Sequence, residues 1–281
     1  MRTIVLQSYR TTDIPFWISR CLASVREWSR ANGFAYECHG DEVFELCGSE
    51  YLASVGGNIR SITNLARLEL TRAAHGRGYD RAIWLDADVI VFDQERFRIS
   101  LAERYAFARE TWVARHDQRI AIEHGVNNCA FAFMRDEPDL DMLINLTRHI
   151  ARHRKITSNY QVGGDIVKGL RNSLAFSTLE HVGMFSPCLI TGIARGDTEL
   201  LSVLAREFGQ PVFAANLAAT PGNHAPVSDA DLCSAMNLLL STRGGVINDY
   251  LSPKAPPGKA GMSARVKKLF SRFSKKRRIA G

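Results

Sequence analysis

The stretch Trp84–Asp93 reads WLDADVIVFD and sets Asp86 and Asp88 one residue apart between two apolar runs. Residues i and i+2 of an extended strand point to the same side, so the two carboxylates should face one point if the backbone stays extended through Ala87. Close carboxylates repel each other, and a divalent cation removes that repulsion. Mg²⁺ or Mn²⁺ held by one or two carboxylates completes its shell with waters and phosphate oxygens. The stretch therefore predicts a site for a metal-bound nucleotide diphosphate.

The segments before this stretch alternate between strand and helix patterns. Apolar runs predict strands at Thr3–Gln7, Phe34–Cys38 and Ala82–Asp86. Helical spacing predicts a helix that is capped by Asp13, starts at Pro15 and stops at Asn32-Gly33, and a second over 61–76. Such alternation favours a mixed, mostly parallel α/β sheet flanked by helices, with a ligand crevice at the carboxyl ends of the strands.

The pattern is less regular after the stretch. Strands are expected at Tyr105–Arg109, Cys129–Met134 and Val212–Leu217, and helices over Leu140–Ile150, near Glu199–Phe208 and after Ser228. A Pro/Gly-rich segment at 251–261 reads as a linker. The predicted organisation is one main domain over 1–250, this linker, and a tail over 262–281.

The composition is that of a soluble globular enzyme. The chain has 281 residues, 46% hydrophobic and 23% charged, which suits one large domain. It shows neither a signal-peptide core nor an apolar run long enough to span a membrane, so a cytoplasmic protein is expected. Its six cysteines are scattered without CxxC pairs, which indicates neither a zinc site nor a disulfide framework.

The positive charge is concentrated at the C-terminus. The net charge is +7, but ten Lys or Arg and no acidic residue follow from Tyr250, leaving 26 basic against 29 acidic residues before it. This argues against a nucleic-acid-binding surface on the main domain. In the tail, the apolar residues at i, i+3, i+4 and i+7 are Val266, Leu269, Phe270 and Phe273. This spacing predicts a cationic amphipathic helix that binds an anionic membrane surface from the cytoplasmic side. Nucleic-acid binding and a disordered solubilising tail are the alternatives.

Two groups of segments resemble known enzyme families. ARLEL (66–70) with YDRAIWLDADVIVFD (79–93) resembles the GT-A glycosyltransferases of family 8, the glycogenin and lipopolysaccharide galactosyltransferase type. LQSYRTTDIPFW (6–17) and YECHGDEVF (36–44) resemble the family 32 type, which includes capsular and mannosyltransferases. The resemblance implies a GT-A (Rossmann-like) fold, a nucleotide-sugar donor such as a UDP-sugar, Mn²⁺ or Mg²⁺ on the DxD pair, and retention at the anomeric carbon.

The resemblance also implies roles for particular residues. The nucleotide would contact the residues after the first strand, Gln7, Ser8, Tyr9 and Arg10. Arg67 would lie near the donor sugar or the diphosphate, Asp86 would touch the metal or the ribose, and Asp88 would be the firmer metal ligand. Arg67 could instead be a surface helix residue.

The segment GVNNCAFAFM (125–134) resembles the family 8 pattern beside the donor sugar. Asn127 and Asn128 are therefore sugar-binding candidates, with Asn128 also placed among the catalytic residues. A plain turn before a strand is the alternative explanation for both asparagines.

Two segments depart from the family 8 pattern. VGGDIVK (162–168) offers only Asp165 as a carboxylate near the reacting sugar. The Gly163-Gly164 amides could approach a substrate there, or the segment could be a turn with Asp165 as a helix cap. TPGNHAP (220–226) offers His224 as a third metal ligand, although a solvated loop histidine is equally possible.

The leading hypothesis is a metal-dependent transferase that moves a hexose from a nucleotide-diphosphate sugar to a glycan or lipid-linked acceptor in envelope or capsular polysaccharide synthesis. One alternative is a haloacid-dehalogenase-type phosphatase, whose first strand also ends in DxD. The other is a catalytically degenerate membrane-associated binding protein.

Overall fold

The computed structural model of the chain describes residues 1–251 except 118 and 220–225. His224, most of the predicted linker and the whole predicted tail lie outside the described residues, so their roles stay predictions. The chain forms two compact units. Unit 1 comprises Met1–Ile90, Arg98–Glu110 and Gly125–Leu179, and unit 2 comprises Val91–Phe97 and the described residues of Thr111–His124 and from Glu180 onward.

The described residues form the following elements. The strands are β1 (Thr3–Ser8), β2 (Ala35–His39), β3 (Arg81–Leu85), β4 (Val89–Val91), β5 (Tyr105–His116), β6 (Arg119–Met134), β7 (Ser177–Leu179), β8 (Val182–Phe185) and β9 (Ala214–Leu217). The α-helices are α1 (Phe16–Ala31), α2 (Ser49–Ser54), α3 (Ile59–Gly76), α4 (Pro138–His153), α5 (Gly164–Leu170), α6 (Pro187–Arg195), α7 (Thr198–Phe208), α8 (Asp229–Thr242) and α9 (Gly245–Asn248). Two 3₁₀ helices are η1 (Asp41–Cys47) and η2 (Asn159–Val162).

A six-stranded sheet has the order β2-β1-β3-β6-β5-β7. β1 pairs in parallel with both β2 and β3, which aligns Leu6 with Glu37 and with Trp84. β6 runs antiparallel to β3, and β7 runs parallel to β5. The sheet is therefore mixed and mostly parallel, as the sequence predicts, and β1, β2 and β3 all end at the same edge.

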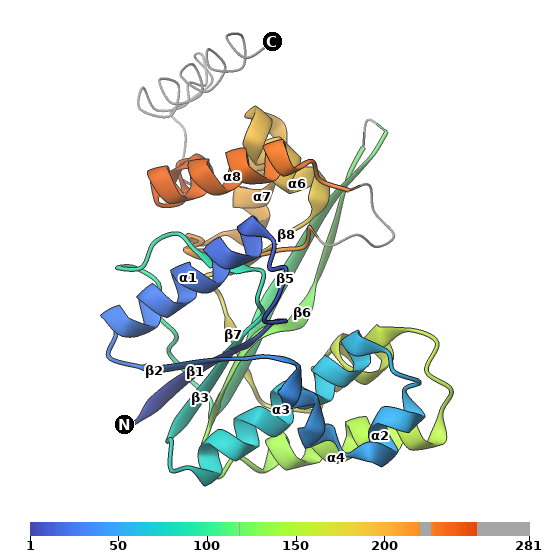
Figure 1. Cartoon of the computed structure of the whole chain (residues 1–281). Coiled ribbons are helices and arrows are strands. Elements are labelled where there is room, and N and C mark those ends of the chain that lie inside the picture. The colour runs from blue at the N-terminus through green and yellow to red at the C-terminus, as the bar shows by residue number, and fades with distance from the viewer. Residues whose placement is uncertain (118, 220–225, 252–281) are drawn as a thin grey trace. The chain divides into compact units, whose positions relative to one another are not determined.

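Alternate residues of β1 and β3 are buried on opposite faces. Ile4, Leu6 and Trp84 pack into the main hydrophobic core of unit 1, which contains the apolar side of α3. Their neighbours Val5 and Ile83 are fully buried but belong to the other face. Figure 1 shows α3 and α1 on opposite sides of these strands. Burial on both faces explains why these strands are continuous apolar runs instead of alternating ones.

Two helix starts, those of α1 and α3, differ from the predicted ones, and that of α8 agrees. α1 begins after Pro15 without a side-chain cap, so the predicted cap by Asp13 is wrong; Asp13 itself has a left-handed φ of 50°. α3 begins two residues earlier than expected, because the Asn58 side chain accepts a hydrogen bond from the Ser61 amide and caps it. Ser228 caps α8 as predicted, accepting from the Asp231 amide.

Unit 2 carries helices α6, α7, α8 and α9, and β8 and β9 pair in parallel. These two strands belong to a three-stranded sheet of order β4-β9-β8. The strands β5 and β6 are much longer than predicted and continue from unit 1 into unit 2. In the part of the chain that the structure describes, no helix has the length and apolar character needed to cross a membrane.

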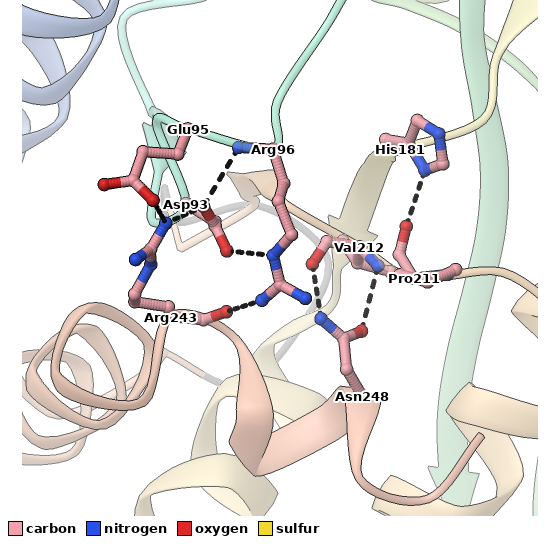
Figure 2. Close-up of polar contacts among 8 residues, drawn as sticks. All are labelled: Asp93, Glu95, Arg96, His181, Pro211, Val212, Arg243 and Asn248. Atoms are coloured by element: carbon pink, nitrogen blue, oxygen red, sulfur yellow. Dashed lines mark hydrogen bonds and ion pairs between the residues drawn. The ribbon is translucent and has the colours of Figure 1, made fainter. Parts of the chain in front are cut away.

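A charged cluster that we call the clasp joins the loop after β4 to the end of α8 within unit 2 (Figure 2). Fully buried Asp93 accepts hydrogen bonds from Arg243 Nη2 (2.7 Å), Arg96 Nε (2.5 Å) and the Arg96 amide (3.1 Å). Arg96 also donates to the Arg243 carbonyl oxygen, and Arg243 Nη2 donates to Glu95 (2.6 Å). Asn248 bonds both backbone polar groups of Val212 nearby. The clasp fixes the chain a few residues after Asp86 and Asp88.

Candidate functional site

The DxD pair lies on a tight turn at the carboxyl end of β3. The Val89 amide donates to the Asp86 carbonyl oxygen (2.9 Å), and the Asp86 amide donates to the Cys129 carbonyl oxygen (2.7 Å). The backbone is therefore not extended through Ala87, and the expectation that the two carboxylates share one side of a strand is wrong. Both carboxylates are half-buried, because the turn places them at the rim of the sheet.

Asp86 is held on the α3 side of the sheet. Its Oδ1 accepts a hydrogen bond from Trp84 Nε1 (2.6 Å) and pairs with Arg67 Nη1 (3.0 Å). Burial raises the pKa of the Asp86 carboxyl above its ordinary value, and the Arg67 charge and the Trp84 hydrogen bond oppose this shift without cancelling it. The site therefore still favours additional positive charge near Asp86.

Arg67 is a buried component of this site and not a surface residue, so the surface alternative is wrong. Only 7% of it is exposed. Its Nη1 donates to the Asn128 carbonyl oxygen (2.7 Å), its Nε donates to the Thr63 carbonyl oxygen (3.3 Å), and its guanidinium lies 5.4 Å from the centre of the Trp84 ring. These contacts fix a positive charge beside Asp86.

The charge of Asp88 acts on two buried cysteines, Cys21 on α1 and Cys129 on β6. Burial raises the pKa of the Cys21 thiol on α1 well above its ordinary value, and the Asp88 charge raises it further. Burial likewise raises the pKa of Cys129 on β6, and the charges of Asp86, Asp88 and Glu110 add to that effect. Three carboxylates therefore act on Cys129 at this edge of the sheet.

Gln7 supports the turn from the end of β1. It is fully buried, its Nε2 donates to the Asp86 carbonyl oxygen (3.1 Å), and its Oε1 accepts from Tyr36 Oη (3.0 Å). The structure thus shows Gln7 positioning the DxD backbone. Its predicted contact with a nucleotide stays a prediction.

Ser8 and Tyr9 follow at the edge of the sheet and are half-buried, whereas Arg10 is exposed. The Arg10 guanidinium lies 5.7 Å from the centre of the Tyr9 ring and donates to the Asp13 carbonyl oxygen (2.7 Å). The three residues lie at the edge where β3 also ends, as predicted. Their nucleotide contacts stay predictions.

Asn127 and Asn128 lie inside β6, so a turn before the strand is the wrong explanation for them. Asn128 Nδ2 donates to Asn64 Oδ1 (3.1 Å), and the Asn128 carbonyl oxygen accepts from Arg67. Asn127 Oδ1 accepts from the Cys129 amide (2.8 Å), and its Nδ2 donates to Glu110 Oε1 (3.0 Å). Both asparagines are thus connected to the DxD turn.

The glycine pair lies against the same network. A Cβ atom on Gly163 would lie 2.3 Å from Asn64 Nδ2, so this backbone approaches the amide more closely than any other residue type allows. A small cavity of about 20 Å³ lies here, with Asn64, Asn128 and Gly163 among its lining residues, and it can hold about one water molecule.

Asp165 is exposed in the first turn of α5. The helix cap is Gly163, which makes no side-chain hydrogen bond, so the interpretation of Asp165 as the cap is wrong. The structure thus places Asp165 two residues from the glycine that contacts Asn64. Its catalytic role stays a prediction.

Glu110 and Lys168 belong to the site but have no role in the sequence predictions. Lys168 Nζ lies 2.6 Å from Glu110 Oε2, and the Glu110 side chain is only 12% exposed. Lys168 belongs to VGGDIVK, and Glu110 directly follows the predicted strand 105–109. The rule that selects Asp86, a carboxylate at a predicted strand end, could have selected Glu110 too.

The donor set at the turn fits a divalent cation that carries a phosphate ligand. Among residues 1–251 outside the gaps at 118 and 220–225, no group of three or more His, Cys, Asp or Glu side chains could enclose a metal. Two carboxylates at an open rim suit Mg²⁺ or Mn²⁺, which retain waters and bind substrate phosphates. The raised pKa of Asp86 also indicates that added positive charge would be favourable there.

Comparison with solved structures identifies the fold. A glycosyltransferase involved in the glycosylation of the major capsid of PBCV-1 aligns with a TM-score of 0.50 at 10% identity, covering 84% of this chain and 100% of that chain. The chain shares its fold with a glycosyltransferase.

Two further glycosyltransferases align at lower TM-scores. The PaToxG glycosyltransferase aligns at 0.40 and 10% identity over 98% of this chain and 85% of that chain. GlyE of Streptococcus pneumoniae TIGR4 aligns at 0.41 and 12% identity over 98% of this chain and 64% of that chain. No protein-family model and no curated protein sequence matches the chain.

Proposed function

We propose that the chain is a glycosyltransferase that moves a hexosyl group from a nucleotide-diphosphate sugar, with Mn²⁺ or Mg²⁺ held by Asp86 and Asp88. The observation that carries the proposal is the DxD turn at the shared carboxyl edge of three parallel strands, with buried Arg67 fixed beside Asp86. The fold shared with a solved glycosyltransferase supports it.

The residues at and around the turn have different proposed roles in binding a donor. Asp86 and Asp88 would hold the cation, which when bound neutralises negative charge on a departing diphosphate. Arg67 fixes the orientation of Asp86 and adds a permanent positive charge behind it. Gln7 fixes the carbonyl oxygen of Asp86 and so holds the turn in place before a ligand binds.

The uncharged groups of the site suit the sugar. The amide side chains of Asn64 and Asn128 bond each other beside Gly163. Amides can both donate to and accept from sugar hydroxyls. We place the hexosyl group on this side of the turn, with Asp165 as the carboxylate nearest in sequence.

A nucleotide screen tests the proposal. Thermal unfolding should shift with one of UDP, GDP, ADP or CMP, and only when Mn²⁺ is present. Asp88→Ala should abolish that shift and lower metal-dependent donor hydrolysis by at least about 100-fold, because a transition-state charge contact is lost. Asp141→Ala is a matched control, since Asp141 is an exposed carboxylate of the same unit that pairs with Arg72 on α3. A metal-independent shift, or wild-type activity in Asp88→Ala, would reject the proposal.

The finer features of the proposed reaction rest on family resemblance. We propose retention at the anomeric carbon, a UDP-sugar donor, and a glycan or lipid-linked acceptor of envelope or capsular polysaccharide. Proton NMR of the first product formed would distinguish retention from inversion by the coupling constant of the anomeric proton.

The basic sequence at 262–281 motivates a membrane-surface location. Removing these residues should release the protein from vesicles that contain anionic lipid, while neutral vesicles serve as the control. Unchanged binding of the shortened chain to anionic vesicles would refute this location.

A further inference from the structure

Tyr160 is a large aromatic residue that the fold leaves open to solvent beside the candidate site. Tyr160 is 57% exposed, whereas tyrosine rings commonly pack against other side chains. It lies in η2, directly before the glycine pair Gly163-Gly164. The ring is therefore accessible to a ligand that approaches this segment.

The backbone that carries Tyr160 is firmly held. η2 opens with a capping box, in which Ser158 Oγ accepts from the Tyr160 amide (3.2 Å). Gln161 Oε1 accepts from the amides of Ser158 (3.0 Å) and Thr157 (2.8 Å). The ring is therefore presented by a hydrogen-bonded turn, and its exposure does not result from a loosely held segment.

The turn also lies next to the groups assigned to the sugar. η2 packs against α3, and the backbone of Gly163 at its end contacts Asn64. A Cβ atom on Gly164 would lie 3.9 Å from Tyr160 Cδ1. Asn64 in turn bonds Asn128. The segment that carries Tyr160 thus adjoins the two hydrogen-bonded amides within unit 1.

We infer that Tyr160 is a stacking platform for a pyranose ring of the acceptor glycan, an inference that rests on the proposed function. One face of a pyranose presents several C–H groups, which pack against the negative face of an aromatic ring, while amides bind the hydroxyls at its edge. The charged corner formed by Arg67 and Asp86 suits the diphosphate of the donor. Tyr160, on a segment that adjoins neutral amides, suits an uncharged sugar.

Saturation-transfer NMR tests this inference on the full chain. The probes are the methyl α- and β-pyranosides of glucose, galactose and mannose, with diamagnetic Mg²⁺ and the nucleotide that gives the largest thermal shift. Wild type and Tyr160→Phe should saturate the ring C–H protons of at least one probe. Tyr160→Ala should lower that signal at least fivefold, because the platform is removed. Phe16→Ala is the control, since Phe16 is 67% exposed on another element of unit 1.

Two results would overturn the platform: an undiminished signal in Tyr160→Ala, or no signal from wild type with any of the six probes. A thermal unfolding curve for each variant shows whether it is folded. Donor hydrolysis by wild type is measured on the same samples, and it reports on the proposed function separately. Absent hydrolysis counts against the transferase, whereas hydrolysis with a Tyr160-independent sugar signal counts against the platform alone.

Discussion

Asp86 and Asp93 stand seven residues apart in WLDADVIVFD, yet their surroundings shift their pKa values in opposite directions. Burial raises the pKa of Asp86, and one guanidinium with one indole N–H does not offset it. Burial would also raise the pKa of Asp93, but hydrogen bonds from Arg243 and Arg96 outweigh it and lower that pKa. Asp93 has two charged donors where Asp86 has one, and the additional donor favours the lower pKa at Asp93.

The difference distinguishes a binding group from a structural one. Asp93 is fully enclosed and bonded by two guanidinium groups of unit 2, so its charge is already compensated. Asp86 is at an open rim with its charge only partly compensated. A cation would therefore gain more at Asp86 than at Asp93.

Asp93→Asn should give the largest loss of stability. Removing the charge leaves the two guanidinium groups of the clasp without their shared partner, and breaking a buried ion pair costs about 3 kcal/mol or more. Both arginine side chains are about half exposed, at 45% and 54%, so we expect the lower end of that range. Urea unfolding measures it. Wild-type stability in Asp93→Asn would show that the clasp is not structural.

The same substitution should change how stability depends on pH. The folded pKa of Asp93 is lowered, so its contribution is present above the ordinary Asp value of about 3.9 and is lost as the pH falls through the folded value. The stability difference between wild type and Asp93→Asn should thus be constant near pH 7 and shrink below about pH 4. A difference that stays the same down to pH 3 would contradict the assigned pKa shift.

Arg67→Met should have an intermediate effect, about 2 kcal/mol, because the Asn128 carbonyl oxygen loses a charged donor and Asp86 loses its only resolved ion-pair partner among the described residues. A double-mutant cycle with Asp86→Asn separates these two causes. If Arg67→Met lowers the free energy of unfolding equally in the Asp86→Asn background and in wild type, the ion pair contributes nothing to stability.

Asp86→Asn alone should have the smallest effect on folding, below about 1 kcal/mol. The amide keeps an oxygen for Trp84 and Arg67, and the buried Arg67 guanidinium keeps its hydrogen bonds to the Asn128 and Thr63 carbonyl oxygens. The metal-dependent nucleotide shift should nevertheless disappear. If Asp86→Asn destabilises the chain as much as Asp93→Asn, the contrast between the two carboxylates is wrong.

The sequence predicts the first half of unit 1 well because its signals are local. The apolar runs of β1 and β3 and the helical spacing of α3 each lie within one segment. The turn at Asp86 was not predictable in the same way, since the Cys129 carbonyl oxygen that holds the Asp86 amide comes from β6, more than 40 residues later. Burial of Arg67 likewise depends on Asn128.

Unit 2 was predicted less completely. α7, β9 and the capped start of α8 carry local patterns and were expected, whereas α6 and β8 were not. Asp93 was visible at the end of the quoted stretch but had no assigned role, because its partner Arg243 lies 150 residues away. Ion pairs at such separations leave no periodic trace in a sequence.

The backbone of Gly163 approaches Asn64 so closely that a change at this glycine would affect the hydrogen bonds that lead to Asp86. A side chain is excluded there by space, since a Cβ atom on Gly163 would lie 2.3 Å from Asn64 Nδ2. A single methyl group there would push the Asn64 amide, which bonds Asn128, whose carbonyl oxygen holds Arg67 against Asp86. The displacement caused by one added carbon atom at position 163 would thus pass through these contacts to the turn that carries Asp86 and Asp88.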